Sequence, residues 1–87
     1  MFLAAPEALA YGPSYCNSST CSLANGPSVG QIYFEMPRGS GVKMLCWTDN
    51  QWYKGTNRWF KVQTDYGSGY GYMIATQVSN QTSVPHC

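Results

Sequence analysis

Four cysteines offer the clearest chemistry in the sequence. They are Cys16, Cys21, Cys46 and Cys87, and the single histidine, His86, precedes the last of them. Four cysteines can form two disulfides in three alternative pairings, and together with the histidine they could also bind zinc. Zinc ribbons place their cysteines in Cys-x-x-Cys pairs, and the spacings in this chain differ from that arrangement. We therefore expect disulfides, with no metal site and no cofactor.

The favoured pairing joins Cys16 to Cys21 and Cys46 to Cys87. In the loop-entropy model a cross-link stabilises a fold by restricting the unfolded chain, and the effect grows with the length of the closed loop. The long loop would contribute about 4 kcal/mol and the short loop about 2 kcal/mol. Small exported domains use such cross-links where their hydrophobic core is too small. The cysteines therefore predict a secreted protein.

The groups needed for catalysis are sparse. A serine or cysteine nucleophile needs a base that a third group holds in place, and His86 lies beside a predicted disulfide. A glycosidase needs two facing carboxylates, but the acidic residues all lie in or next to predicted turns, where acids usually solvate the chain. These residues are Glu7, Glu35, Asp49 and Asp65. We predict that the protein is not an enzyme and assign no catalytic residue.

A glycine run at Gly67-x-Gly69-x-Gly71 could be taken for a phosphate-binding loop. Such loops need a following helix and a lysine, and neither is expected here. A hairpin whose glycines permit positive φ or a close approach of strands explains the run better.

Aromatic residues suggest a binding surface. The chain has 3 Trp, 7 Tyr and 3 Phe among 87 residues, more than a core of this size can bury. Exposed rings can stack on sugars or prolines while their polar tips form hydrogen bonds. The predicted binding residues, which lie in or beside loops, are Trp52, Tyr53, Tyr66, Tyr70 and Tyr72. For each of them the alternative is that it only seals one end of the fold. The better candidates for the core are Phe34, Trp47, Trp59 and Phe60.

Short strands must position these side chains. Dense turn signals, such as Asn-Gly-Pro at 25–27 and Pro-Arg-Gly-Ser-Gly at 37–41, separate short alternating runs near 32–36, 42–48, 58–64 and 71–74. Residues 75–77 fit a single helical turn. Five or six strands at this spacing predict a small barrel or sandwich. In the second run the alternation places Val42, Met44 and Cys46 on one face and Lys43, Leu45 and Trp47 on the other.

Length and charge exclude several classes of protein. A chain of 87 residues forms one domain at most. Its 5 basic and 4 acidic residues provide no basic stripe, so we expect no nucleic-acid partner. No apolar run approaches the roughly 20 residues of a membrane-spanning helix, so we expect no membrane span.

Two segments resemble those of a known family. Leu-Ala-Asn-Gly-Pro-Ser at 23–28 is similar to the opening strand and Arg-Ser-Gly-Pro-Ser loop of bacterial SH3-like (SH3b) domains, with Ala24 and Asn25 replacing the usual arginine and serine. Met-Pro-Arg-Gly-Ser-Gly-Val at 36–42 is similar to the family's Leu-Pro-x-Gly-x-x-Val segment. The residues that resemble the secreted actinobacterial branch are 42–47, 57–62 and 80–87.

The resemblance implies a barrel of five to seven strands, export from the cell and a binding role often directed at peptidoglycan or a protein partner. The departures from the family pattern lie at 16–21 and 67–72. We therefore expect an all-β, disulfide-stapled SH3-like barrel over residues 16–87, preceded by an N-terminal arm or leader remnant over 1–15. Its expected place is extracellular or on the cell envelope.

Three functions remain open from the sequence. The first is a secreted, non-catalytic binding module that contacts peptidoglycan or a protein or peptide partner through its loop aromatics. The second is a structural subunit of an extracellular or virion assembly that docks through residues 1–15. The third is a secreted enzyme or enzyme inhibitor. An inhibitor would need an exposed rigid loop, and the loop from Cys16 to Cys21 is the one candidate.

Overall fold

Seven antiparallel strands form one curled sheet in residues 11–87, the part of the chain that this computed structural model describes. The strands are β1 (Ser14–Cys16), β2 (Thr20–Ala24), β3 (Ile32–Pro37), β4 (Gly41–Tyr53), β5 (Thr56–Thr64), β6 (Tyr70–Ile74) and β7 (Val78–Ser79). Single 3-10 turns, η1 (Val29–Gln31) and η2 (Ala75–Gln77), precede β3 and β7. The predicted all-β fold and the helical turn at 75–77 are confirmed.

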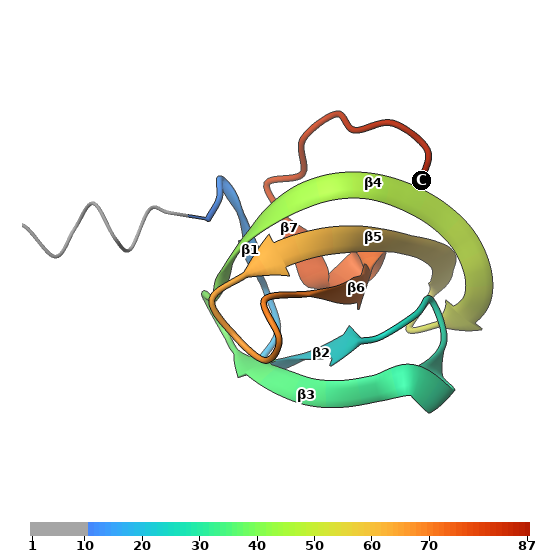
Figure 1. Cartoon of the computed structure of the whole chain (residues 1–87), viewed down its shortest axis with the longest axis horizontal. Helices are drawn as coiled ribbons and strands as arrows, with labels where there is room; N and C mark the ends of the chain where they lie inside the picture. The colour runs from blue at the N-terminus through green and yellow to red at the C-terminus, as the bar shows by residue number, and fades with distance from the viewer. Residues whose placement is uncertain (1–10) are drawn as a thin grey trace, which may run out of the picture.

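The sheet curls into a half-barrel and does not close. Its strand order is β3-β2-β6-β5-β4-β1-β7, which places β3 at one end with β2 as its only strand neighbour among the described residues. The strongly bent β4 passes over the top of the molecule while β3 forms its lower border (Figure 1). An open edge therefore remains along β3.

The first strand begins inside the segment that we expected to be an arm. Ser14 and Tyr15 pair with Val42 and Gly41 of β4, and Tyr15 also pairs with Ser79 of β7. Residues 1–10 of the predicted arm lie outside the described part of the chain.

A β-bulge in β4 overturns the predicted alternation. The register shifts between Met44 and Cys46, so that Cys46 stands opposite Lys61 and Trp47 stands opposite Phe60. Directly opposite residues of an antiparallel pair share a face. Trp47 therefore turns toward the core with Phe60, and Cys46 turns to the outer face. The prediction that placed Cys46 with Met44 was wrong because one extra residue inverts every later position.

The inner face of the curl holds the main core. Among the predicted core residues, Phe60 is buried there, and Trp47 packs half-buried against it. Trp59 is also buried, but on the opposite face of β5, in a smaller cluster with Ala24 and Ile74. The main core consists of Cys16, Cys21, Leu23, Met36, Val42, Met44, Phe60, Val62, Met73 and Val78.

Phe34 was wrongly predicted to lie in the core. It stands opposite Leu23 and shares its inner face, yet Phe34 is 36% exposed while Leu23 is 0% exposed. The difference follows from the open edge, since β3 carries no further strand to cover its side chains.

Two disulfides and a buried glutamine link separate parts of the fold. Cys16 is bonded to Cys21 and Cys46 to Cys87, the pairs favoured from the sequence. Gln77, which is 5% exposed, accepts a hydrogen bond from the Ser22 N–H at 3.3 Å and donates one to the Thr20 carbonyl at 3.5 Å. These contacts tie η2 to β2 across the curl.

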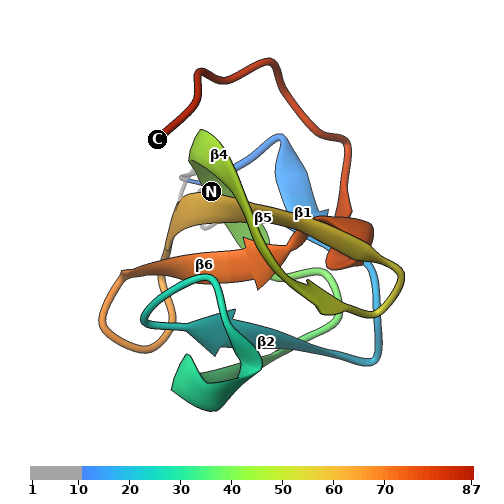
Figure 2. The same cartoon turned by 90° about the vertical axis from the view of Figure 1, so that its right-hand side faces the viewer.

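The polar C-terminal tail is fastened along β4. The Trp47 N–H donates to the Pro85 carbonyl at 3.0 Å, and the Cys87 N–H donates to the Trp47 carbonyl at 2.8 Å. The tail arches from β7 back to β4 at the top of the molecule (Figure 2). It thus covers the edge of β4 that lies beyond β1.

Candidate binding surface

The predicted binding aromatics separate into two groups. Tyr53, Tyr70 and Tyr72 lie on the outer face of the sheet with buried Trp59, and Trp52 stands at one end of them. We call these five residues the outer aromatic row. Tyr66 lies apart from them and packs against the main core on the inner face.

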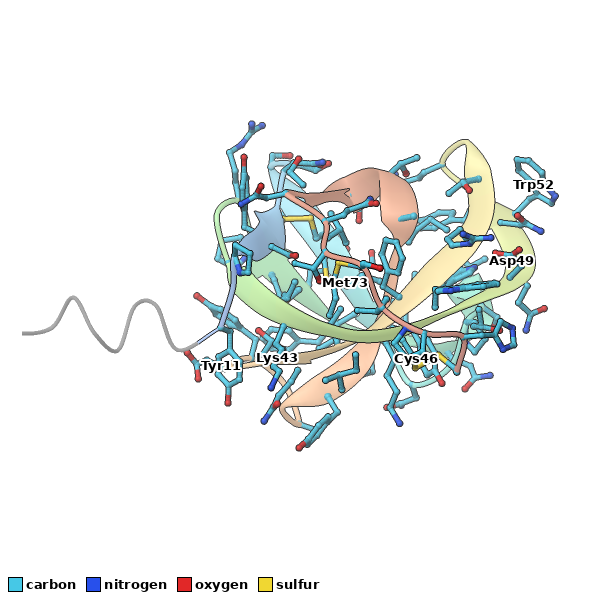
Figure 3. The ribbon with its side chains drawn as sticks, turned by 90° about the horizontal axis from the view of Figure 1, so that it is seen from above. Tyr11, Lys43, Cys46, Asp49, Trp52 and Met73 are labelled. Carbon is cyan, nitrogen blue, oxygen red and sulfur yellow. A yellow bond between two sulfur atoms is a disulfide. The ribbon has the colours of Figure 1, made fainter. Side chains whose placement is uncertain are left out.

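The β4–β5 hairpin builds one end of the row. The Tyr53 ring stacks on Trp59 with centroids 6.0 Å apart and planes inclined by 12°, and the Lys54 ammonium lies 5.0 Å from the Tyr53 centroid. The Trp59 Nε1–H donates to the Gln51 carbonyl at 2.8 Å. Trp52 is 67% exposed and points away from the domain, at the end opposite Tyr11 (Figure 3). The hairpin therefore presents Trp52 on a packed base.

The hairpin tip is also fastened to the loop between β2 and β3. The Gln51 side-chain oxygen accepts a hydrogen bond from the Val29 N–H at 2.8 Å, and the Gln51 N–H reaches the Pro27 carbonyl at 3.5 Å. These bonds limit the motion of the segment that carries Trp52.

Strand β6 continues the row across the sheet. Tyr70 and Tyr72 are two residues apart and share a face. Tyr72 is half-buried against the small cluster opposite Lys61, whereas Tyr70 is 51% exposed opposite Gln63. The row thus runs from the hairpin to the β5–β6 loop, with its most exposed rings at its two ends.

The glycine run shapes the β5–β6 loop, as predicted. Gly67 and Gly69 have φ values of 58° and 93°, which favour glycine. At Gly71, a Cβ would come within 2.6 Å of the Leu23 side chain. The glycine at this position therefore lets β6 lie close to the core.

A second aromatic group lies beside the open edge of β3. The Phe34 and Tyr66 rings are 6.1 Å apart, and the Tyr33 and Phe34 rings are 6.4 Å apart. The Tyr33 hydroxyl donates to the Tyr70 carbonyl at 3.0 Å and lies 2.9 Å from the Ser68 hydroxyl. The sequence did not indicate that Tyr33 and Phe34 belong to an exposed aromatic group. Their alternation matches any half-buried strand, and only the position of β3 at the end of the sheet leaves Phe34 uncovered.

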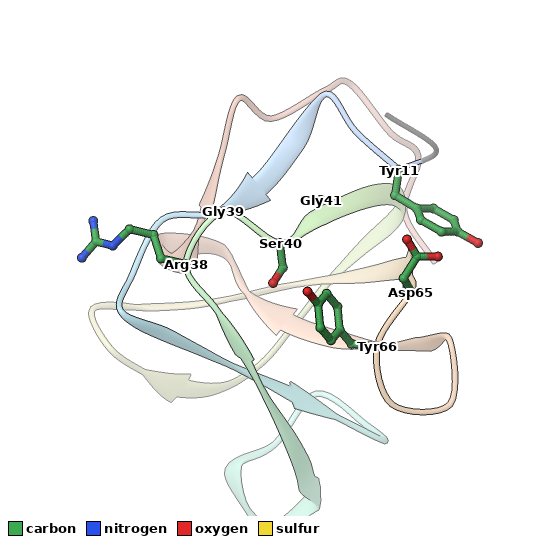
Figure 4. Close-up of a pocket in the computed structure, with 7 residues that line it drawn as sticks. All are labelled: Tyr11, Arg38, Gly39, Ser40, Gly41, Asp65 and Tyr66. Atoms are coloured by element: carbon green, nitrogen blue, oxygen red, sulfur yellow. The ribbon is translucent and has the colours of Figure 1, made fainter. Parts of the chain in front are cut away.

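A cavity of about 280 Å³ adjoins this group (Figure 4). Tyr11, Ser40, Asp65 and Tyr66 line it together with Gly39 and Gly41 of the turn before β4. Arg38 also borders the cavity, but its guanidinium points away from it. The cavity thus combines two aromatic rings with one carboxylate.

The residues around Trp47 form an ion pair and ring contacts with one another. Arg58 donates from Nε and Nη2 to the two carboxylate oxygens of Asp49 at 2.6 and 3.0 Å. Its guanidinium carbon lies 4.0 Å from the Trp47 centroid, and His86 meets Trp47 edge-on with centroids 4.3 Å apart. His86 is therefore engaged with Trp47.

We expect this ion pair to give a small acid sensitivity. The hydrogen bonds from Arg58 hold the pKa of Asp49 below its ordinary value of about 3.9. The pair contributes stability above that value, and the contribution is lost as the pH falls through the lowered pKa. An Asp49→Asn variant should therefore lose less stability than the parent between about pH 4 and 2, measured by urea unfolding at each pH. The difference in acid sensitivity between the parent and the variant should shrink in high salt. The reason is that the side chains of Arg58 and Asp49 are 41% and 39% exposed, so salt screens the pair.

Within residues 11–87, no three His, Cys, Asp or Glu side chains gather where they could hold a metal ion. No helix in the same residues is long and apolar enough to cross a membrane. Comparison of the chain with protein-family models, with curated proteins and with solved structures found no significant match.

Proposed function

We propose that this protein is an exported, non-catalytic binding module of the SH3b kind, which acts outside the cell or on its envelope. Its outer aromatic row holds peptidoglycan or a protein partner. The proposal rests on the sequence resemblance to SH3b domains and above all on the exposure of the row, where Trp52 is 67% and Tyr70 is 51% exposed.

Exposed rings at both ends of a supported row suit a ligand that spans it. Large apolar side chains in water are a source of binding free energy, because covering them removes apolar surface from solvent. Trp59 and the hydrogen-bonded hairpin tip already order the row, so a ligand would order few side chains. Low ordering cost favours affinity.

Two further observations support an extracellular, non-catalytic role. Both cysteine pairs are disulfides, which persist in oxidising compartments. Two of the groups that could act in acid or base chemistry are engaged elsewhere: Asp49 is paired with Arg58, and His86 packs on Trp47. These contacts favour binding over catalysis.

Truncation of Trp52 should abolish most of this binding. We expect Trp52→Ala to weaken sedimentation with purified peptidoglycan, or capture of the protein partner from an envelope fraction, by about tenfold or more, as for other large aromatic contacts. The free energy of unfolding should change by less than about 0.5 kcal/mol, because the side chain is largely exposed. Co-sedimentation isotherms and urea unfolding measure the two quantities.

Tyr15 provides the matched control. It is another exposed aromatic, at 42%, but it lies on β1 outside the outer aromatic row. Tyr15→Ala should bind as the parent does, and Tyr70→Ala should bind less tightly. Equal binding by the parent, Trp52→Ala and Tyr70→Ala would refute the proposal, as would a parent that binds neither peptidoglycan nor any envelope protein.

A further inference from the structure

The backbone of β3 offers hydrogen-bonding groups that point out of the sheet. On β2, the Ser22 N–H and the Thr20 carbonyl bond to Gln77, so these groups point away from β3. Backbone direction alternates along an antiparallel ladder, and Ser22 stands opposite Glu35. The Ser22–Glu35 pair is therefore the non-hydrogen-bonded kind. The N–H and carbonyl of Glu35 consequently point away from β2, toward the open edge.

The inner side of this edge is apolar and uncovered. Phe34 shares the face of Leu23 but is 36% exposed, and the Tyr66 ring lies 6.1 Å from it. In Figure 4, Tyr66 lies between β3 and the β5–β6 loop. A strand placed beside β3 would set every second side chain against Phe34 and Tyr66.

The outer side of the edge is acidic. Glu35 alternates with Phe34 and is exposed on the opposite face of β3. The one ion pair within residues 11–87 joins Asp49 to Arg58, so Glu35 forms no ion pair with a described residue. Side chains of a strand next to Glu35 would therefore lie beside an exposed carboxylate that forms no ion pair.

We propose that the open edge of β3 binds an extended peptide with alternating apolar and basic side chains. The peptide adds a strand to the sheet and pairs with the outward N–H and carbonyl of Glu35. Its apolar residues cover Phe34 and Tyr66, and its basic residues lie beside Glu35. This surface is separate from the outer aromatic row, so the inference goes beyond the proposed function and does not depend on it.

The test uses the full chain and a labelled peptide of alternating Val and Lys, as long as the six residues of β3. Fluorescence anisotropy should show binding, and the amide signals of residues 33–36 should shift more than those of the β4–β5 hairpin. We expect Glu35→Lys to weaken binding at least tenfold through charge. Glu35→Pro should weaken it similarly, because proline removes the outward N–H, which does not bond to β2.

Controls separate this site from the other surface and from misfolding. A peptide of alternating Val and Glu should bind at least tenfold less tightly, and Trp52→Ala should bind the Val-Lys peptide as the parent does. Amide shifts in the unmodified chain locate the site without any variant. The inference fails if the peptide does not bind, if its shifts map to the hairpin, or if Glu35→Lys binds equally well. It also fails if sedimentation shows that the free chain pairs with a second copy through β3.

Discussion

Replacing Cys46 and Cys87 together by alanine lowers the free energy of unfolding by about 4 kcal/mol in the loop-entropy model. The bond closes a loop between residues 41 positions apart, so its loss releases a large part of the unfolded chain. The folded state also loses order, because the Pro85 and Cys87 bonds to Trp47 no longer have a covalent anchor. Urea unfolding of both proteins under oxidising conditions measures the difference.

The second disulfide is the internal control for this result. Cys16 and Cys21 are only 5 positions apart, so replacing both by alanine should cost about 2 kcal/mol in the same model. Both are fully buried, so lost packing adds to that figure. If the variant that lacks Cys46 and Cys87 were as stable as the parent, the tail and β4 would stay together without the bond. If loss of the Cys46–Cys87 bond releases the tail, His86 should detach from Trp47 and the tryptophan fluorescence should change.

Features that local patterns determine were predictable from the sequence. Turn residues and alternating runs predicted an all-β fold, and the structure has seven strands in one sheet. The cysteine spacings predicted disulfides, and both bonds join the favoured pairs. Gly67 and Gly69 were expected to adopt positive φ, and they do. Each of these expectations depends on residues that are close in the chain or linked covalently.

Features that depend on which strands are neighbours were not predictable. The alternation in β4 gave no sign of the bulge that turns Trp47 toward the core. Phe34 has the same local pattern as a buried residue, and its exposure depends on β3 lying at the end of the sheet. A sequence pattern specifies which face of a strand a side chain occupies, but not whether another strand covers that face.

The binding aromatics show the same limit. Excess aromatic content correctly indicated exposed rings, and Trp52 and Tyr70 are the two most exposed of the five predicted residues. The sequence did not reveal that Tyr53 rests on Trp59 or that Tyr66 belongs to the other face of the sheet. Those relations join β4 to β5 and the β5–β6 loop to β3.

Truncating Trp59 to alanine should destabilise the domain by about 3–5 kcal/mol. Its side chain is 0% exposed, packs with Ala24 and Ile74, and donates a hydrogen bond to the Gln51 carbonyl at 2.8 Å. The substitution removes the base on which Tyr53 stacks and leaves the Gln51 carbonyl without this donor. Binding by the outer aromatic row should weaken as well. Urea unfolding and peptidoglycan sedimentation measure the two effects.

A loss this large brings a small domain close to unfolding, so a milder variant is needed beside it. Trp59→Phe keeps an aromatic ring under Tyr53 but removes the Nε1–H, and it should cost about 1–2 kcal/mol. The order of stability should be Trp52→Ala, then Trp59→Phe, then Trp59→Ala, because exposure falls from 67% at Trp52 to 0% at Trp59. If Trp59→Ala were as stable as Trp52→Ala, the hairpin would not be packed on Trp59. The outer aromatic row would then lack the rigid base on which its proposed affinity depends.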